Sequence, residues 1–247
     1  MRSLFRSFER AGVDYLLISG QASVLYGAAT FSEDVDIWVR PTATNLRRLL
    51  SGLAACRARV HKLTPPLTLR NADAGHGFHF VVPGRPLPVY LDVMARPPRV
   101  GSFADALSRA RRLSTDWGTL PVVEIEDLVA LKQTRRLADY DVITNLASVR
   151  VAEAAAKPPR ALLRWAARHS FRAEERAALL ARLGDRRSAD ACREDILREI
   201  GILQARDVRY WKRRIDELRK LRRSGHLWPE GALVSAIIGA KPVRSTR

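Results

Sequence analysis

The segment DVDIWV, which begins at Asp34, alternates acidic and apolar side chains. In an extended strand neighbouring side chains point to opposite faces, and side chains two residues apart share one face. Asp34 and Asp36 are therefore expected together on one face, with Val35, Ile37 and Val39 packed on the other. We expect this strand in a small mixed β-sheet with packed helices, which is an α/β or α+β fold.

Four other apolar runs are predicted to supply strands, and one of them is a short strand at 121–125, at the start of PVVEIEDLVALKQTRRL. VDYLLIS at 13–19 is apolar, contains a β-branched residue and ends at Gly20, as a buried strand does. HGFHFVVP at 76–83 and PVYLDVMA at 88–95 are joined by the turn signal Pro-Gly-Arg-Pro. Asp92 interrupts the last run and is therefore a candidate functional carboxylate.

The pattern changes after about residue 148, where strand-like runs disappear and helical patterns follow one another. Helices are expected at 159–169, 173–183, 188–204 and 206–223. We predict a site-bearing domain over 1–148, a basic all-helical domain over 149–240 and a poorly ordered tail over 241–247. In the last helix Val208, Trp211, Ile215, Leu218 and Leu221 form one apolar stripe, by which the helix is expected to pack.

The formal net charge of +17 predicts attraction to a polyanion such as nucleic acid, and less so to an anionic membrane surface. Residues 149–247 hold 24 Lys and Arg against 12 Asp and Glu, so most of the excess lies in the helical part. A solvated, arginine-rich surface without a partner is an equal alternative. An RNA-binding face therefore stays one of two interpretations.

Other bulk features narrow the class of protein. No apolar stretch approaches the roughly 20 residues of a membrane span, and the first fifteen residues do not read as a signal peptide. Cys56 and Cys192 are far apart and lack metal-ligand spacing, so neither a disulfide framework nor a zinc site is indicated. We expect a cytoplasmic protein that does not enter a membrane.

Acidic residues spaced D-x-D on a strand, with a third acid nearby, suit metal-dependent phosphoryl transfer. Mg²⁺ is commonly held by one or two carboxylates together with substrate phosphates and water. In that arrangement Asp34 and Asp36 would be shared metal ligands, and Asp92 would complete the site and accept a proton. Taken alone, D-x-D also arises by chance at exposed strand edges. The turn Ser19-Gly20 adds a place where backbone N–H groups can approach phosphates closely.

The segment LLISGQASVLYGAATFSEDVDIWV resembles the DNA-polymerase-β-type nucleotidyltransferase superfamily, with its strand, Gly-Ser-like turn, helix and D-x-D strand. Within it the chain is most similar to the bacterial branch of AbiEii-type toxins and minimal nucleotidyltransferases. LDVMA and LVALKQTRRLADYDVI agree with the third acid and with a helix in which a lysine precedes Arg-x-x-Asp. The resemblance covers residues 13–145.

The resemblance implies a Mg²⁺- or Mn²⁺-dependent transfer of a nucleoside monophosphate from an NTP, ATP included, to an acceptor hydroxyl. It implies catalytic and metal-binding roles for Asp34, Asp36 and Asp92. Nucleotide binding falls to Ser19, Gly20, Ser32, Lys132, Arg136 and Asp139. Its toxin-like branch implies RNA, such as a tRNA end, as acceptor and a cognate toxin or antitoxin as partner.

Departures from the superfamily pattern leave other functions open. Ser19-Gly20 reverses the usual order, and Thr30 and Ala138 stand where related sequences often have Arg and Lys. An antitoxin-type enzyme that modifies a partner protein and a decayed nucleic-acid-binding module are the alternatives.

His76, His79 and Trp211 have simpler readings than a functional one. The two histidines, three residues apart, point to opposite faces of a strand, which favours structural roles over a metal pair. Either could still lie near the nucleotide if its strand pairs with that of Asp92. Trp211 could stack on a base, but its place in the apolar stripe favours a core position.

Overall fold

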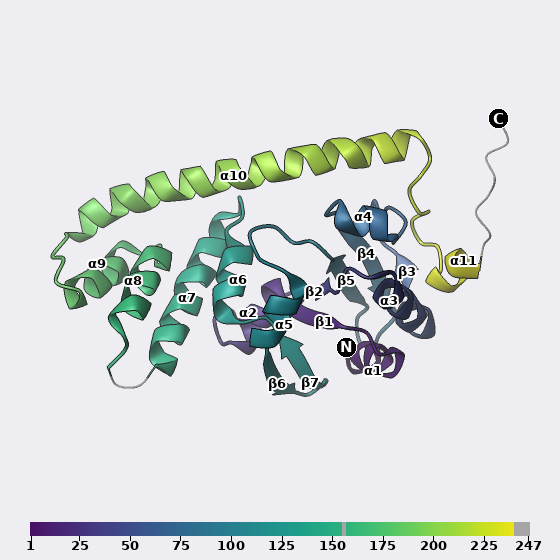
Figure 1. Ribbon diagram of the computed structural model, residues 1–247, viewed down its shortest axis with the longest axis horizontal. Coiled ribbons are helices and arrows are strands. Elements are labelled where there is room, and N and C mark those ends of the chain that lie inside the picture. Colours follow the sequence, from purple (N-terminus) through teal and green to yellow (C-terminus); the bar gives the residue numbers. More distant parts are fainter. Residues whose placement is uncertain (155–156, 240–247) are drawn as a thin grey trace.

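The computed structural model describes residues 1–154 and 157–239, in which eleven helices and seven strands follow one another (Figure 1). The strands are β1 (Tyr15–Ile18), β2 (Asp34–Val39), β3 (Arg59–Val60), β4 (Phe78–Val82), β5 (Val89–Met94), β6 (Arg111–Thr115) and β7 (Gly118–Val122). The helices are α1 (Arg2–Ala11), α2 (Ser19–Leu25), α3 (Ala43–Ala55), α4 (Leu69–Asp73), α5 (Phe103–Arg109), α6 (Ile125–Lys132), α7 (Leu137–Glu153), α8 (Arg160–His169), α9 (Ala173–Arg182), α10 (Ala189–Arg223) and α11 (Val234–Gly239).

The seven strands form one mixed sheet in the order β3-β4-β5-β2-β1-β7-β6. β2 runs parallel to β5, and β1 runs parallel to β7, whereas the other neighbours are antiparallel. The predicted α+β fold, a mixed sheet with packed helices followed by a helical C-terminal region, is confirmed.

The central strand β2 has the two faces that its sequence predicts. On the face away from the acids, the side chains of Val35, Ile37 and Val39 are fully buried. Trp38 lies on the same face as Asp36 but is also buried, with its ring edge-on to Phe103 of α5 at 5.7 Å. The indole Nε1 donates to the carbonyl of Ala95 at 3.1 Å. The carboxylate face of β2 is therefore open only in the first half of the strand.

The edge hairpin β6–β7 was not foreseen. A strand was predicted over 121–125, and β7 lies three residues earlier, at Gly118–Val122. Its partner β6 has the sequence RRLST, and its residues alternate only between half-buried and exposed. A strand at the edge of a sheet needs little apolar character, which explains why the pattern gave no signal.

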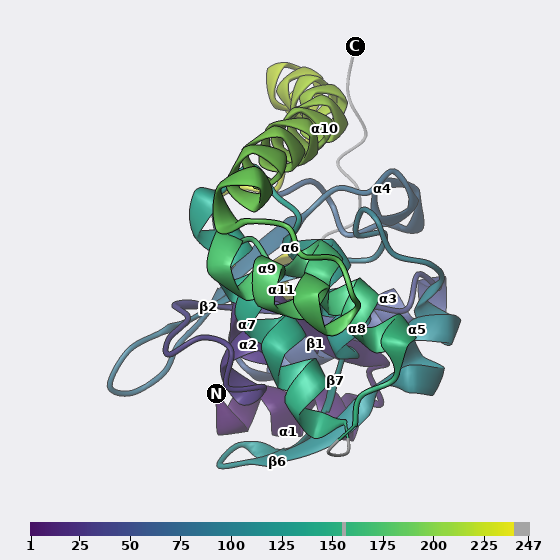
Figure 2. The same ribbon diagram turned by 90° about the vertical axis from the view of Figure 1, so that its left-hand side faces the viewer.

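One continuous helix replaces two predicted ones. The patterns at 188–204 and 206–223 belong to α10, which has 35 residues. Residues 202–223 contain no Gly or Pro, and Ala205 at the expected break is a strong helix former, so nothing interrupts the helix. At 1.5 Å per residue α10 is about 50 Å long, and it runs across one side of the molecule (Figures 1 and 2).

The chain returns from α10 to the sheet half of the molecule. The amide of Trp228 donates to the carbonyl of Thr64, and that of Val60 to the carbonyl of Ala232, each at 2.9 Å. α11 then packs against α3. The predicted domain boundary at residue 148 lies inside α7, and the division into domains stays a prediction. The predicted tail at 241–247 lies outside the described residues.

No helix within residues 1–154 and 157–239 is both long and apolar enough to cross a membrane.

Candidate active site

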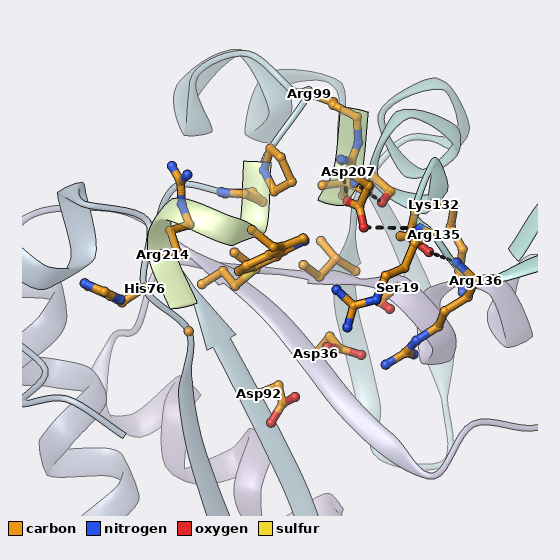
Figure 3. A pocket seen from close by; sticks show the side chains of 18 of the residues that line it. Ser19, Asp36, His76, Asp92, Arg99, Lys132, Arg135, Arg136, Asp207 and Arg214 are labelled. Atoms are coloured by element: carbon orange, nitrogen blue, oxygen red, sulfur yellow. Dashed lines mark hydrogen bonds and ion pairs between the residues drawn. The ribbon is translucent and has the colours of Figure 1, made fainter. Parts of the chain in front are cut away.

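The parallel pairing of β2 with β5 brings two of the predicted acids together. Asp36 is the register partner of Asp92, while Asp34 lies opposite Tyr90. Because residues in register on neighbouring strands point to the same face, the Asp36 and Asp92 carboxylates lie side by side. Both line a cleft of about 440 Å³ between the sheet and α10 (Figure 3). Asp34 shares their face but does not line this cleft.

Asp36 lies where ionisation is unfavourable. Burial has the largest effect, followed by the neighbouring carboxylate of Asp92, and together they raise the pKa of Asp36 to about 7. A hydrogen bond with the Ser19 side chain and the charge of Lys132 act in the opposite direction, while Asp34 adds to the increase. A cation bound between these carboxylates would offset the repulsion among them.

Asp92, unlike Asp36, has a histidine as its hydrogen-bond partner. His79 is its register neighbour on β4, and its Nδ1 lies 2.7 Å from Asp92 Oδ1. Burial opposes ionisation of Asp92, but the hydrogen bond and charge of His79 outweigh it and keep the pKa of Asp92 below its usual range. The expectation that the strand of His79 pairs with that of Asp92 is confirmed.

His76 differs from His79 in its surroundings. Its side chain is buried, with 5% exposed, and its Nε2 lies 3.7 Å from Oε2 of Glu217 on α10. Burial has the largest effect on His76 and lowers its pKa. The two histidines thus serve different contacts and do not form a pair.

The turn between β1 and α2 holds Ser19 at the cleft, while Gly20 and Ser32 lie beside it. Ser19 adopts a left-handed conformation with φ 58°, and its carbonyl accepts from the Ser23 hydroxyl at 2.8 Å. A Cβ at Gly20 would overlap the Ser32 side chain, with 2.8 Å to Ser32 Cβ, so only glycine allows this close approach. The Ser32 hydroxyl donates to the Asp34 carbonyl at 3.0 Å. Of these three predicted residues only Ser19 lines the cleft.

The junction of α6 and α7 supplies the cationic wall of the cleft. Lys132, Arg136 and Asp139, all predicted from the sequence, line it. Lys132 Nζ lies 2.8 Å from Asp139 Oδ1, and the Thr134 hydroxyl donates to Asp139 Oδ2 at 2.5 Å. Asp139 therefore orients Lys132, whose side chain is only 12% exposed.

Arg135 also lines the cleft, although it was not predicted from the sequence. The run Arg135-Arg136 was the available signal. Thr30 and Ala138, which depart from the superfamily pattern, are exposed and do not line the cleft.

Helix α10 forms the far wall of the cleft, which the sequence did not predict. Trp211, Ile215 and Leu218 line it, and these half-buried to exposed side chains belong to the predicted apolar stripe. The prediction of a core position for Trp211 is wrong, because its side chain is half-buried and lines the cleft. The stripe does not pack completely either, since Ile215 is 40% exposed and Val208 is 49% exposed. A stripe that faces a cleft keeps its apolar pattern without complete burial.

A buried ion pair fixes α10 to the site. Arg99 Nη1 lies 2.9 Å from Asp207 Oδ1, and the two side chains are 7% and 2% exposed. Arg99 also donates to the carbonyls of Ala130 and Leu131 at 2.9 and 3.1 Å, and the Arg135 amide donates to Asp207 at 3.1 Å. Figure 3 shows this pair near Lys132, the last residue of α6. It ties the end of α6, the loop after β5 and α10 into one unit.

The acids suit a hard cation by their chemistry rather than by a closed ligand cage. Among the described residues no group of three His, Cys, Asp or Glu side chains could hold a metal ion as it stands. Mg²⁺ needs no such cage, because one or two carboxylates together with substrate phosphates suffice. The oxygen donors of Asp36 and Asp92 meet that requirement.

Fold and site together define an α+β protein with paired carboxylates on a mixed sheet, a cationic wall beside them and an apolar helix face opposite. The sequence matches no known family model and no curated protein. A crystal structure of a proposed nucleotidyltransferase from H. pylori aligns with 84% of this chain and 94% of its own, at 13% identity and a TM-score of 0.42.

Proposed function

We propose that the chain is a metal-dependent nucleotidyltransferase, which transfers a nucleoside monophosphate from an NTP to an acceptor hydroxyl and releases pyrophosphate. The supporting observation is the placement of Asp36 and Asp92 beside Lys132, Arg135 and Arg136 in one cleft. A metal–triphosphate complex needs carboxylates for the metal and cations for the phosphates at neighbouring positions. The cleft offers both within the size range of small-molecule sites.

Asp36 and Asp92 would hold Mg²⁺ or Mn²⁺ in the cleft, and we propose Asp34, on the same face of β2 but outside the cleft lining, as the third ligand. When bound, the metal would supply charge neutralisation at the reacting phosphate and lower the pKa of the acceptor hydroxyl. Asp92 would accept the hydroxyl proton, and His79, at 2.7 Å, fixes the orientation of its carboxylate.

The cationic wall would bind the triphosphate. Lys132 is positioned by Asp139, and Arg136 stands at the start of α7 facing the same cleft (Figure 3). Arg135 adds a further positive charge, which can replace the Arg and Lys side chains that are absent at positions 30 and 138. The Ser19-Gly20 turn and the backbone amides at the start of α2 would complete the phosphate contacts. Positioning and charge neutralisation, rather than covalent chemistry, would carry the catalysis.

The acceptor we favour is RNA, such as a tRNA end, and the support for it is charge. In the second half of α10, residues 206–223, nine Lys and Arg stand against three acids, and one of these acids is the buried Asp207. An RNA acceptor would also suit the toxin-like role that the sequence resemblance implies. A cytoplasmic location and a cognate toxin or antitoxin partner belong to the same proposal.

The direct test supplies each α-labelled NTP with Mg²⁺ and either total RNA or candidate partner proteins. We expect label in RNA, matched by an equal amount of pyrophosphate and dependent on the divalent cation. Label in protein instead would favour the antitoxin-type enzyme. If no acceptor gains label and no NTP binds, the decayed nucleic-acid-binding module is the better description.

Trp211→Ala should weaken NTP binding about tenfold, because the proposed nucleobase would lie against the apolar face of α10 and lose an aromatic stacking partner. Inorganic tripolyphosphate has no base, so its affinity should stay unchanged. Equilibrium dialysis of both ligands measures this difference.

Leu197→Ala provides the matched control, since Leu197 lies on the same helix, is 66% exposed and does not line the cleft. Equal weakening of NTP and tripolyphosphate by Trp211→Ala would place the base elsewhere.

A further inference from the structure

A second basic groove lies between α1 and α3, away from the cleft. It has a volume of about 740 Å³, and the turn after α3 completes it. None of its lining residues is acidic. Four of them are arginines, namely Arg2, Arg6, Arg10 and Arg57. It shares no lining residue with the cleft under α10. In both ribbon views α1 and α10 lie on opposite sides of the molecule (Figures 1 and 2).

Small residues form the floor of the groove because α1 and α3 cross closely. A Cβ at the buried Gly52 would lie 3.0 Å from Phe8 Cδ1, and the Ser7 hydroxyl donates to the Gly52 carbonyl at 2.8 Å. Ser3, Ala55 and Cys56 continue the floor. The groove thus has arginines among its lining residues and a floor of small, partly polar residues.

The arginines of α1 are arranged as a row. Arg2, Arg6 and Arg10 are four residues apart, so they share one face of the helix at a spacing of about 6 Å. Arg2 is fixed by its bonds to the Asp116 carbonyl at 2.9 and 2.6 Å. Within the described part of the chain, Arg6, Arg10 and Arg57 make no side-chain hydrogen bond or ion pair.

Like charges at this spacing repel one another on an isolated helix. The repulsion within this row destabilises α1, and a bound anion with regularly spaced charges would offset it.

We infer that this groove binds the phosphate backbone of a structured RNA. A row of arginines about 6 Å apart matches consecutive phosphates along a strand, and the absence of acids from the groove favours a polyanion. An anionic membrane suits it less, because none of the exposed large hydrophobic side chains among the described residues lies on α1 or α3.

The groove and the cleft lie on different sides of the molecule, so one ligand that reaches both must be large. The inference deepens the proposed function and relies on its RNA acceptor: a folded RNA is held by its body at α1–α3 while its end enters the cleft. A short oligonucleotide would occupy the cleft alone.

The double variant Arg6→Glu/Arg10→Glu tests the groove through binding of a full-length tRNA transcript without NTP, measured by filter binding over a range of salt concentrations. We expect the Kd to rise about tenfold or more and the slope of log K against log salt to become shallower by 1 to 2, as about two phosphate contacts are lost. Binding of a short oligonucleotide with the same 3′ end should not change.

Arg164→Glu/Arg168→Glu on α8 is the matched control, because both residues are exposed, are four residues apart and line neither site. It makes the same change in net charge, and we expect its Kd to stay within about threefold of wild type. An equal loss of tRNA affinity in the two double variants would overturn the proposal that the groove binds RNA. The proposal would also be overturned if Arg6→Glu/Arg10→Glu left tRNA binding unchanged and abolished binding to phosphatidylserine vesicles.

The label-transfer assay separates failure of the groove from failure of the proposed function. If no nucleotide is transferred but the groove variant alone loses tRNA affinity, the groove stands and the transferase proposal falls. If nucleotide transfer to tRNA is intact and equal in both double variants at limiting tRNA, the RNA-binding role of the groove is rejected and the proposed transferase function is kept.

Discussion

Asp36→Asn should reduce nucleotide transfer by at least about 10²- to 10³-fold, because it removes the charge of a central metal-binding carboxylate without changing its size. Initial rates with labelled NTP and saturating Mg²⁺ measure the loss. Asp190→Asn on α10, where the carboxylate is 87% exposed, is the control and should leave the rate unchanged. A rate near that of wild type in Asp36→Asn would remove this carboxylate from the mechanism.

The same substitution should raise stability when no metal is present. Burial and the Asp92 charge raise the pKa of Asp36 to about 7, well above its ordinary value of 3.8. The unfolded chain therefore ionises Asp36 first, and the folded state loses stability as pH rises from about 4 to 7. Asn carries no such penalty, so its advantage in Tm should grow over this pH interval and stay constant above it. Thermal melts in EDTA at pH 4.5 and pH 8 would show the difference, and added Mg²⁺ should stabilise only the wild type.

Asp207→Ala should lower the free energy of unfolding by about 3–5 kcal/mol, because it leaves the Arg99 guanidinium buried without its counter-charge. The backbone amide of Arg135 loses an acceptor in the same variant. Urea denaturation followed by circular dichroism measures the change. Asp216→Ala, which breaks an exposed pair with Arg219 on the same helix, should cost less than about 1 kcal/mol.

The double variant Arg99→Met/Asp207→Leu distinguishes a buried charge from lost packing. Two apolar side chains of similar size leave no charge unpaired, so most of the lost stability should return. If the double variant is as unstable as Asp207→Ala, the ion pair is not the cause.

Sequence patterns predicted the part of the site that depends on short-range rules. Strand alternation placed Asp34 and Asp36 on one face of β2, and the interrupted strand identified Asp92. The parallel register that sets Asp36 opposite Asp92 could not be derived, since a strand's sequence does not specify its neighbour. Lys132 and Asp139 were placed by resemblance alone, and the structure shows them in contact.

The other half of the site depends on contacts between distant segments. Arg99 and Asp207 are 108 residues apart, and neither stands in a motif. The apolar stripe of α10 was visible, but an apolar stripe is the same in sequence whether it meets a core or lines a cleft. Only the tertiary structure shows that Trp211 faces Asp36 and Asp92 across one cavity.

The position of Asp207 on α10 also limits how the length of this helix can vary. Asp207, Trp211 and Leu218 follow one another at intervals of four and seven residues, so the ion pair with Arg99 and the cleft-facing side chains share one rotational phase. An α-helix turns by about 100° per residue. A single residue inserted between 207 and 211 would keep the ion pair and turn Trp211 out of the cleft. Insertions outside residues 207–218 would leave that phase undisturbed, so variation in the length of α10 is compatible with the site only beyond this segment.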